Sequence, residues 1–220
     1  MSSLFHFDSP FMRKLTLVVN LAVLNLLWLI CCIPIFTVGA ATVAMHSVLF
    51  RYIEHTDDEV IRPFFRAFKQ NFKQATCLWL VFLPILTLLG IDALFLYTNG
   101  SGKMALLWIP FAVVGLFSAA ILSYVFPLLA RYNTPTKQAV RNSMLLFLME
   151  FWKSLFVLIL NLLPWATMLI TPQIVFFLGM LWLFFCGSLV AYFNDRILLH
   201  IFKKREYTEP ANDECDTSLL

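Results

Sequence analysis

The amino-acid sequence predicts an all-α fold, a polytopic integral membrane protein with a bundle of five to six transmembrane segments. Of its 220 residues, 60% are apolar and only 13% are charged, whereas soluble domains have about 45–50% apolar and about 25% charged residues. The apolar residues also come in long runs, separated by basic connectors. Together these observations exclude a cytosolic enzyme, a disordered protein and a disulfide-rich secreted module.

One transmembrane helical domain is predicted over residues 1–202, and the charged residues 203–220 are expected to form a disordered cytoplasmic tail. Within the domain, each run of apolar residues is interpreted as one segment. The expected segments are 15–33, 39–53, 76–97, 105–129, 155–170 and 174–193.

The first two segments are separated by Pro34 and a predicted turn at residues 37–39. The first apolar run has about 19 residues, which is long for the apolar region of a signal peptide but right for a spanning helix. The second segment has about 15 residues, which is short for a full span. It is therefore expected either to cross the membrane as a tilted partner of the first segment or to form a half-helix.

The other four segments form two predicted hairpins. The third and fourth segments are each long enough to span a bilayer and are joined by a loop with Asn99-Gly100. The fifth and sixth are joined around Thr171-Pro172-Gln173. Basic, amphipathic connectors precede both hairpins.

The positions of lysine and arginine predict the orientation, because these residues favour cytoplasmic loops. With six crossings, 15 of the 16 lysines and arginines lie on one side and only Lys103 lies on the other. With five crossings, Arg13 and Lys14 move across and the number falls to 13 of 16. We therefore expect both termini in the cytoplasm. The two large basic connectors are cytoplasmic in either topology.

The connector before the third segment has the pattern of an amphipathic helix, with aromatic rings on one face and most cations outside it. One interpretation is anchoring at the level of the lipid headgroups. The other is a docking surface for a cytoplasmic partner. The residues of this candidate interaction surface are Arg62, Phe65, Arg66, Phe68, Lys69, Phe72 and Lys73.

An internal repeat is suggested when the sequence is shifted by 80 positions. Both copies then have an apolar helix, an Arg-Tyr pair, a basic connector and an apolar helix with a proline. The copies run in the same direction, so the repeat would be parallel. The alternative is that the two halves carry similar residues only because they have a similar topology. The matched positions are Arg51-Tyr52 with Arg131-Tyr132, Lys73 with Lys153, and Pro84 with Pro164.

Polar groups inside the spans are the candidates for intramembrane chemistry, because placing them in lipid is costly. We select Asn25, Asp92 and Asn161. His46 is expected to be a hydrogen-bonded bundle residue. Asp195-Arg196 is expected at the cytoplasmic boundary, where the two side chains pair or extend to water.

The sequence contains none of the motifs that would indicate catalysis or a bound cofactor. There is no GxGxxG, P-loop, HExxH or GxSxG pattern, and no CxxC pair among the five cysteines. We therefore predict a protein that is not an enzyme and has no catalytic, metal-binding or cofactor-binding residues. No basic run is interleaved with aromatics as in a nucleic-acid groove, so nucleic acid is not an expected partner.

Several short stretches resemble one bacterial membrane family. They are residues 7–12 (FDSPFM), 24–29 (LNLLWL), 37–40 (TVGA) and 68–76 (FKQNFKQAT). They are similar to the YesL-like family, a domain of unknown function (624), and the resemblance extends over about residues 7–202. It implies location in the bacterial plasma membrane, but no activity or catalytic residue.

Members of that family often look like neighbours of genes for sugar uptake and polysaccharide use in Gram-positive bacteria. This association implies an accessory or regulatory role beside carbohydrate uptake, with the lipid bilayer and a membrane transporter or other membrane protein as partners. The alternative is a small secondary transporter of a polar solute. In that case Asn25, Asp92 or Asn161 should face a cavity shared by the two halves of the repeat.

Overall fold

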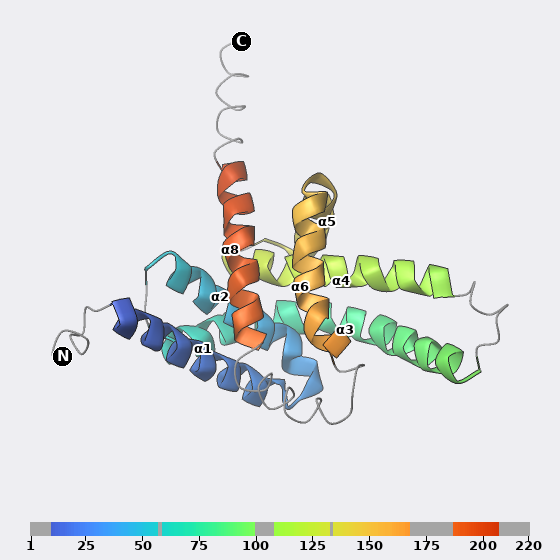
Figure 1. Ribbon diagram of the computed structural model, residues 1–220, viewed down its shortest axis with the longest axis horizontal. Coiled ribbons are helices and arrows are strands. Elements are labelled where there is room, and N and C mark those ends of the chain that lie inside the picture. Colours follow the sequence, from blue (N-terminus) through green and yellow to red (C-terminus); the bar gives the residue numbers. More distant parts are fainter. Residues whose placement is uncertain (1–9, 57–58, 100–107, 133, 168–186, 207–220) are drawn as a thin grey trace, which may run out of the picture.

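The computed structural model describes residues 10–56, 59–99, 108–132, 134–167 and 187–206, and every regular element in these ranges is helical. The elements are α1 (Pro10–Cys32), η1 (Ile35–Thr37), α2 (Val38–Ile53), α3 (Ile61–Asn99), α4 (Trp108–Arg131), α5 (Thr136–Met149), α6 (Phe151–Thr167) and α8 (Gly187–Glu206). In Figure 1, α3 and α4 run side by side, whereas α6 and α8 run roughly at right angles to them.

Length and composition confirm the predicted fold class. Within the described ranges, four helical stretches are long and apolar enough to cross a membrane. A fifth is added if α5 and α6, which meet at a bend of 107°, count as one broken span. The four stretches are Leu15–Cys32, Ile35–Ile53, Ile61–Asp92 and Ile109–Arg131.

The ends of the helices follow the apolar runs closely in the N-terminal part of the chain. Residues 168–186, which include most of the predicted sixth segment, lie outside the described residues. The last described helix, α8, continues to Glu206 and so extends past residue 202, where the tail was expected to begin. Residues 207–220 of that tail also lie outside the described residues.

Pro34 separates α1 from α2, as its lack of a backbone N–H and its fixed φ predict. The turn that follows is closed by Thr37, whose hydroxyl donates to the carbonyl oxygens of Cys31 and Pro34. The indole of Trp79 on α3 donates to the carbonyl oxygen of Ile35 at 2.8 Å. The free carbonyls at this break are therefore satisfied within the protein, as a helix end in an apolar solvent requires.

Small residues let α2 and α3 approach closely. Ala40, Ala41 and Ala44 are fully buried on α2. An added Cβ on Gly39 would lie 2.6 Å from the backbone oxygen of Ala75. Membrane helices associate through such small-residue contacts, because packing takes the place of the hydrophobic effect in lipid. The second segment is thus a buried central helix, despite its shortness.

The amphipathic connector is not a separate interfacial helix, since it forms one continuous helix with the predicted third span. α3 runs from Ile61 to Asn99, and residues 64–83, where the two parts join, contain neither proline nor glycine. The buried face also continues through both parts with helical spacing, from Phe64 through Ala75 and Leu78 to Phe82. One uninterrupted stripe packed on the core therefore favours one uninterrupted helix.

The two copies of the predicted repeat differ at the corresponding place. In the second copy the chain breaks at Glu150, between α5 and α6, and the two helices meet at 107°. The first copy has Gln70 at the matching position, inside the continuous α3. The repeat itself stays a prediction, because the order of helices agrees while their geometry does not.

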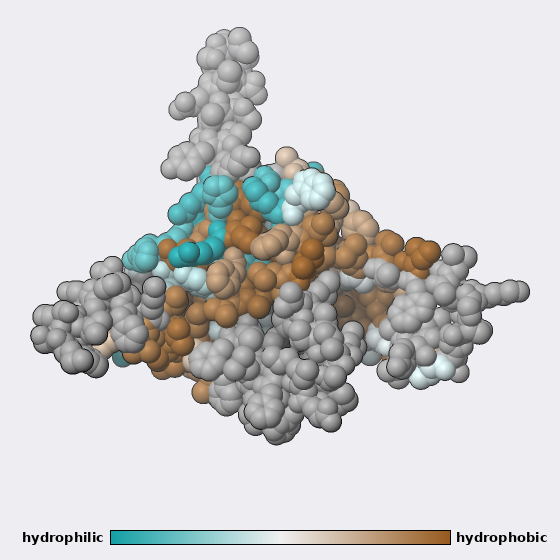
Figure 2. Space-filling model, in the orientation of Figure 1, coloured by the Kyte–Doolittle hydropathy of each residue, from teal (hydrophilic) through white to brown (hydrophobic). Residues whose placement is uncertain are grey.

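The surface of the molecule divides into apolar and polar regions. Hydrophobic residues cover the side formed by α1 and α4 in Figure 2, and hydrophilic residues gather around the upper part of α8. Many large apolar side chains are exposed on the helices, among them Val19, Ile30, Val81 and Leu88. Such a surface would be unfavourable in water, and it fits a protein whose solvent is the lipid bilayer.

Candidate functional site

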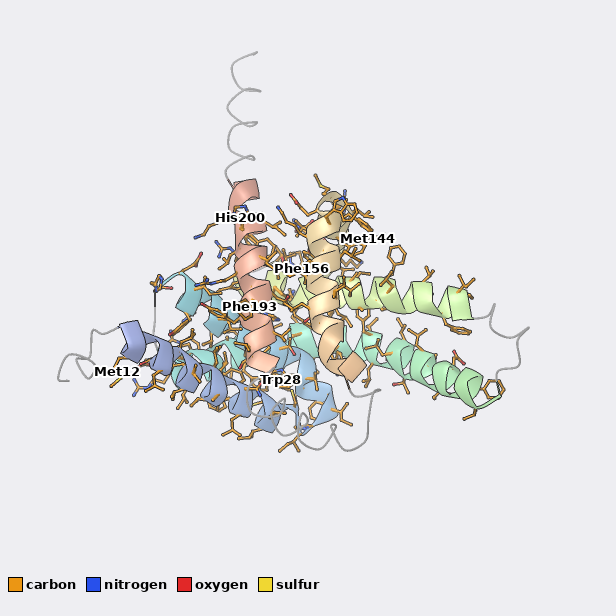
Figure 3. All side chains as sticks on the ribbon, viewed as in Figure 1. Met12, Trp28, Met144, Phe156, Phe193 and His200 are labelled. Carbon is orange, nitrogen blue, oxygen red and sulfur yellow. The ribbon has the colours of Figure 1, made fainter. Side chains whose placement is uncertain are left out.

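A cavity with a mainly apolar wall and several polar groups lies between residues of α1, α2, α4, α6 and α8. Its volume is about 260 Å³. Figure 3 shows Trp28, near the end of α1, beside the lower end of α8. The residues that line the cavity are Trp28, Thr42, Met45, His46, Leu122, Ser123, Phe126, Asn161, Gly187, Val190, Ala191 and Asn194.

A buried pair of ionisable side chains lies at one edge of this cavity. Nδ1 of His46 is 2.8 Å and 3.0 Å from the two carboxylate oxygens of Asp195. The residues are 149 positions apart in the sequence, and the Asp195 side chain is fully buried. With Asp195 ionised, Nδ1–H of His46 donates the shared proton, which orients the ring and leaves Nε2 as its second polar atom. Such a pair can hold or pass a proton.

A chain of amide and hydroxyl groups forms another side of the cavity. The Nδ2 of Asn194 donates to Oδ1 of Asn161 at 2.8 Å, and Nδ2 of Asn161 donates to Oγ of Ser123 at 3.3 Å. The hydroxyl of Ser123 in turn donates to the carbonyl oxygen of Ala119 at 2.8 Å. These bonds join α8, α6 and α4, and they fix the directions in which the two amides point.

One acceptor in this series of hydrogen bonds has no donor among the described residues. The Oδ1 of Asn194 is buried and has no hydrogen-bond partner among the described residues. Leaving a buried acceptor unsatisfied costs about 1–3 kcal/mol. Asn194 also lines the cavity, so a hydroxyl or amine donor that reached this oxygen from the cavity would remove this cost.

Three further hydrogen bonds hold α1 against α2 and α8 beside the cavity. The indole of Trp28 donates to Oγ1 of Thr42 at 3.2 Å. The backbone N–H of Ser188 donates to Oδ1 of the buried Asn25 at 3.1 Å, and the Ser188 hydroxyl donates to the carbonyl oxygen of Leu21 at 2.7 Å. Asn25 therefore acts as a link between helices, which is the usual role of an amide inside a membrane bundle.

The three candidate intramembrane residues have different positions. Asn161 lines the cavity. Asn25 does not line it but contacts Ser188, next to Gly187 in its wall. Asp92 is half-buried near the end of α3 and is not among the lining residues. The structure thus brings two of the three to one region of the bundle.

The candidate interaction surface on α3 is divided by the fold. Its cations Arg62, Arg66, Lys69 and Lys73 are exposed, as is Phe65, whereas Phe68 and Phe72 pack partly buried against the core. The rings of Phe68 and Phe72 lie 5.5 Å apart, centroid to centroid. The exposed part of this surface is therefore mainly basic.

Sequence reasoning missed that the polar residues of α8 belong to this site. Asp195 was expected to pair at the membrane boundary, but its partner is His46, and Arg196 instead lies over the ring of Tyr192. A signal was present in the sequence, because small and polar residues recur at helical spacing. This buried face consists of Ser188, Ala191, Asn194 and Asp195.

Comparison with known proteins gives a family but no activity. The model of the family "Protein of unknown function, DUF624" matches residues 21–93. The chain is 26% identical over 193 residues to "Uncharacterized protein YteU" of Bacillus subtilis (strain 168), an alignment that covers 86% of this chain and 83% of the relative. No solved structure gives a significant match. The resemblance to the YesL-like family of DUF624 membrane proteins that the sequence predicts is thereby confirmed.

Proposed function

We propose that this protein is a non-enzymatic component of the bacterial plasma membrane that binds a small hydroxylated solute in the cavity beside Asn161 and Asn194. Its role would be that of an accessory or regulatory partner of carbohydrate uptake. The observation that carries the proposal is the cavity itself, lined by Asn161 and by Asn194, whose buried Oδ1 has no hydrogen-bond partner among the described residues.

The chemistry of the lining supports a sugar-like ligand. The amides of Asn161 and Asn194 each donate one of their two N–H groups within the protein, which leaves the second for a sugar hydroxyl. The hydroxyls of Ser123 and Thr42 already donate to backbone carbonyl oxygens and can accept from a ligand. Trp28 adds an aromatic ring to the same wall. The volume of about 260 Å³ is slightly below the range of about 300–1,000 Å³ for typical ligand pockets, which favours a monosaccharide over an oligosaccharide.

Direct binding tests the proposal. The purified protein in phosphatidylcholine nanodiscs is titrated calorimetrically with glucose, galactose, mannose and xylose, and with leucine as an apolar control. We expect saturable binding of at least one sugar, and about a 3- to 10-fold weaker affinity in Asn194→Ala, which is the effect of losing one hydrogen bond.

Asn142→Ala is the matched control, because Asn142 is half-buried on α5 and does not line the cavity. This variant should bind as the unchanged protein does. The proposal fails if none of the four sugars binds, or if Asn142→Ala weakens binding as much as Asn194→Ala.

The accessory role assigns the basic surface of α3 to a cytoplasmic partner. We propose that both termini and the exposed cations Arg66, Lys69 and Lys73 lie in the cytoplasm, as the distribution of lysine and arginine predicts. A transporter of the same membrane should then co-purify in mild detergent from sugar-grown cells. The double variant Lys69→Glu/Lys73→Glu should abolish the co-purification. The control Lys137→Glu should not, because Lys137 is exposed on α5. Isolation of the protein without a transporter would contradict the accessory role.

The second candidate function is a small secondary transporter, and the position of His46–Asp195 beside the cavity favours it. Ionisable pairs inside bundles are used as proton relays by transporters. Proteoliposomes separate the two functions. Sugar flux that falls in Asn194→Ala would indicate a carrier, whereas binding without flux would indicate an accessory protein.

A further inference from the structure

A second hollow, with a mainly polar lining, lies where the C-terminal ends of α2 and α4 meet α3. Its volume is about 390 Å³, and it shares no lining residue with the cavity described above. We refer to it as the arginine cleft. Its lining residues are Ser47, Arg51, Gln70, Asn71, Leu129, Ala130, Arg131 and Tyr132.

The two arginines come from matching places in the chain. Arg51 is in the last turn of α2 and Arg131 is in the last turn of α4. They are also equivalent at the offset of 80 residues. A cation at each helix C-terminus is explained by the helix dipole alone. That explanation does not account for two such ends being arranged around one polar cleft.

In the ion pairs that the structure describes around the arginine cleft, positive groups outnumber carboxylates. Nη1 of Arg131 is 3.0 Å from Oε1 of Glu54, and Nζ of Lys203 is 3.5 Å from the same oxygen. One carboxylate therefore faces two cations, while Arg51 adds a third positive charge to the cleft. An anion in the cleft would balance this excess and would compete with Glu54 for Arg131.

The donors in the cleft fit the geometry of a phosphate group. A guanidinium presents a planar fork of N–H groups that binds phosphate oxygens in pairs. The hydroxyl of Ser47 and the amide of Gln70 belong to the same lining and can add neutral hydrogen bonds. The amide of Asn71 is already used, since its Nδ2 donates to the carbonyl oxygen of Ala67 at 3.1 Å.

We propose that the arginine cleft binds a phosphate group between Arg51 and Arg131, with Glu54 as the carboxylate that the phosphate displaces. The phosphate belongs either to a phospholipid headgroup or to a soluble phosphorylated solute, since both offer the same oxygens to the cleft. The site is independent of the sugar cavity and does not rest on the function proposed above.

Two binding measurements distinguish the sources of the phosphate. In the first, the protein in phosphatidylcholine nanodiscs is titrated calorimetrically with inorganic phosphate. In the second, the protein is mixed with vesicles of phosphatidylcholine and phosphatidylglycerol, extracted in mild detergent, and examined by native mass spectrometry for retained phosphatidylglycerol. Binding of free phosphate indicates a soluble ligand, and selective retention of phosphatidylglycerol indicates the headgroup. Either result supports the cleft as a phosphate site.

Three variants test where the phosphate binds. Arg51→Gln should weaken binding by about 10- to 100-fold, the effect of losing a charge-assisted contact. Glu54→Gln should strengthen binding, because it releases Arg131 and Lys203 from their shared carboxylate. Arg62→Gln is the matched control, because Arg62 is exposed on α3 and outside the cleft.

The direction in which Glu54→Gln changes phosphate affinity distinguishes two explanations of the Glu54 contacts. A purely structural ion pair would give weaker or unchanged binding in this variant, whereas a displaced carboxylate gives tighter binding. The proposal is overturned if neither phosphate source binds, if Glu54→Gln does not bind more tightly, or if Arg51→Gln and Arg62→Gln behave alike.

Discussion

His46→Ala is expected to destabilise the protein by about 3–5 kcal/mol, because it leaves the buried carboxylate of Asp195 without its partner. The carboxylate of Asp195 is fully buried, and both of its oxygens contact Nδ1 of His46. Without the imidazole, this charge would have to stay buried without its counterpart or be neutralised by a proton. Unfolding in mixed detergent micelles, followed by circular dichroism at 222 nm, measures the change.

A second substitution separates the effect of charge from the loss of packing. In His46→Ala/Asp195→Asn the buried residue is neutral, so the double variant should be more stable than His46→Ala alone. His200→Ala is the control, because His200 is exposed on the same helix as Asp195 and its loss should change stability by less than about 0.5 kcal/mol. A double variant less stable than His46→Ala would contradict the interpretation as an ion pair.

Gly39→Ala is expected to destabilise the contact between α2 and α3 by about 1–3 kcal/mol, because inserting a methyl group into close packing forces the surroundings to move. The added Cβ would lie 2.6 Å from the backbone oxygen of Ala75 and 2.7 Å from Cβ of Trp79. Neither atom is the end of a flexible side chain, so the helices themselves must separate. The same micelle unfolding experiment measures the loss.

Gly90→Ala provides a matched comparison on α3. An added Cβ at Gly90 meets nothing within 4 Å. Alanine is favoured over glycine inside a helix by about 0.5–1 kcal/mol, so this variant should be unchanged or slightly more stable. If Gly39→Ala is as well tolerated as Gly90→Ala, the close approach of α2 to α3 does not hold in the membrane.

Much of the helical framework could be predicted from the sequence, because each helix is encoded locally. The apolar run of residues 15–33 and the break at Pro34 agree with the end of α1 at Cys32 and the start of α2 at Val38. The continuity of α3 was harder to predict, since a change from amphipathic to apolar composition resembles the boundary between two separate helices. Only the packing of Phe64 in the connector together with Leu78 and Phe82 in the span shows that one helix face runs through both parts.

The candidate site was predictable only in fragments. Asn25 and Asn161 could be selected because polar groups in lipid must find partners, and both have partners around the cavity. Asp92 was selected for the same reason but does not line the cavity. Which helix faces meet depends on the packing of all the helices together, and the local pattern around a residue does not contain that information.

The sequence by itself determined the solvent of this protein, its helical class and its resemblance to a family, because runs of apolar residues and short motifs are local properties. The tertiary structure decided which polar residues act together. It joined His46 to Asp195 across 149 positions, and it placed Arg51 and Arg131 around one cleft. The physical reason is that a buried polar group must be satisfied, but which distant residue satisfies it depends on how the helices pack.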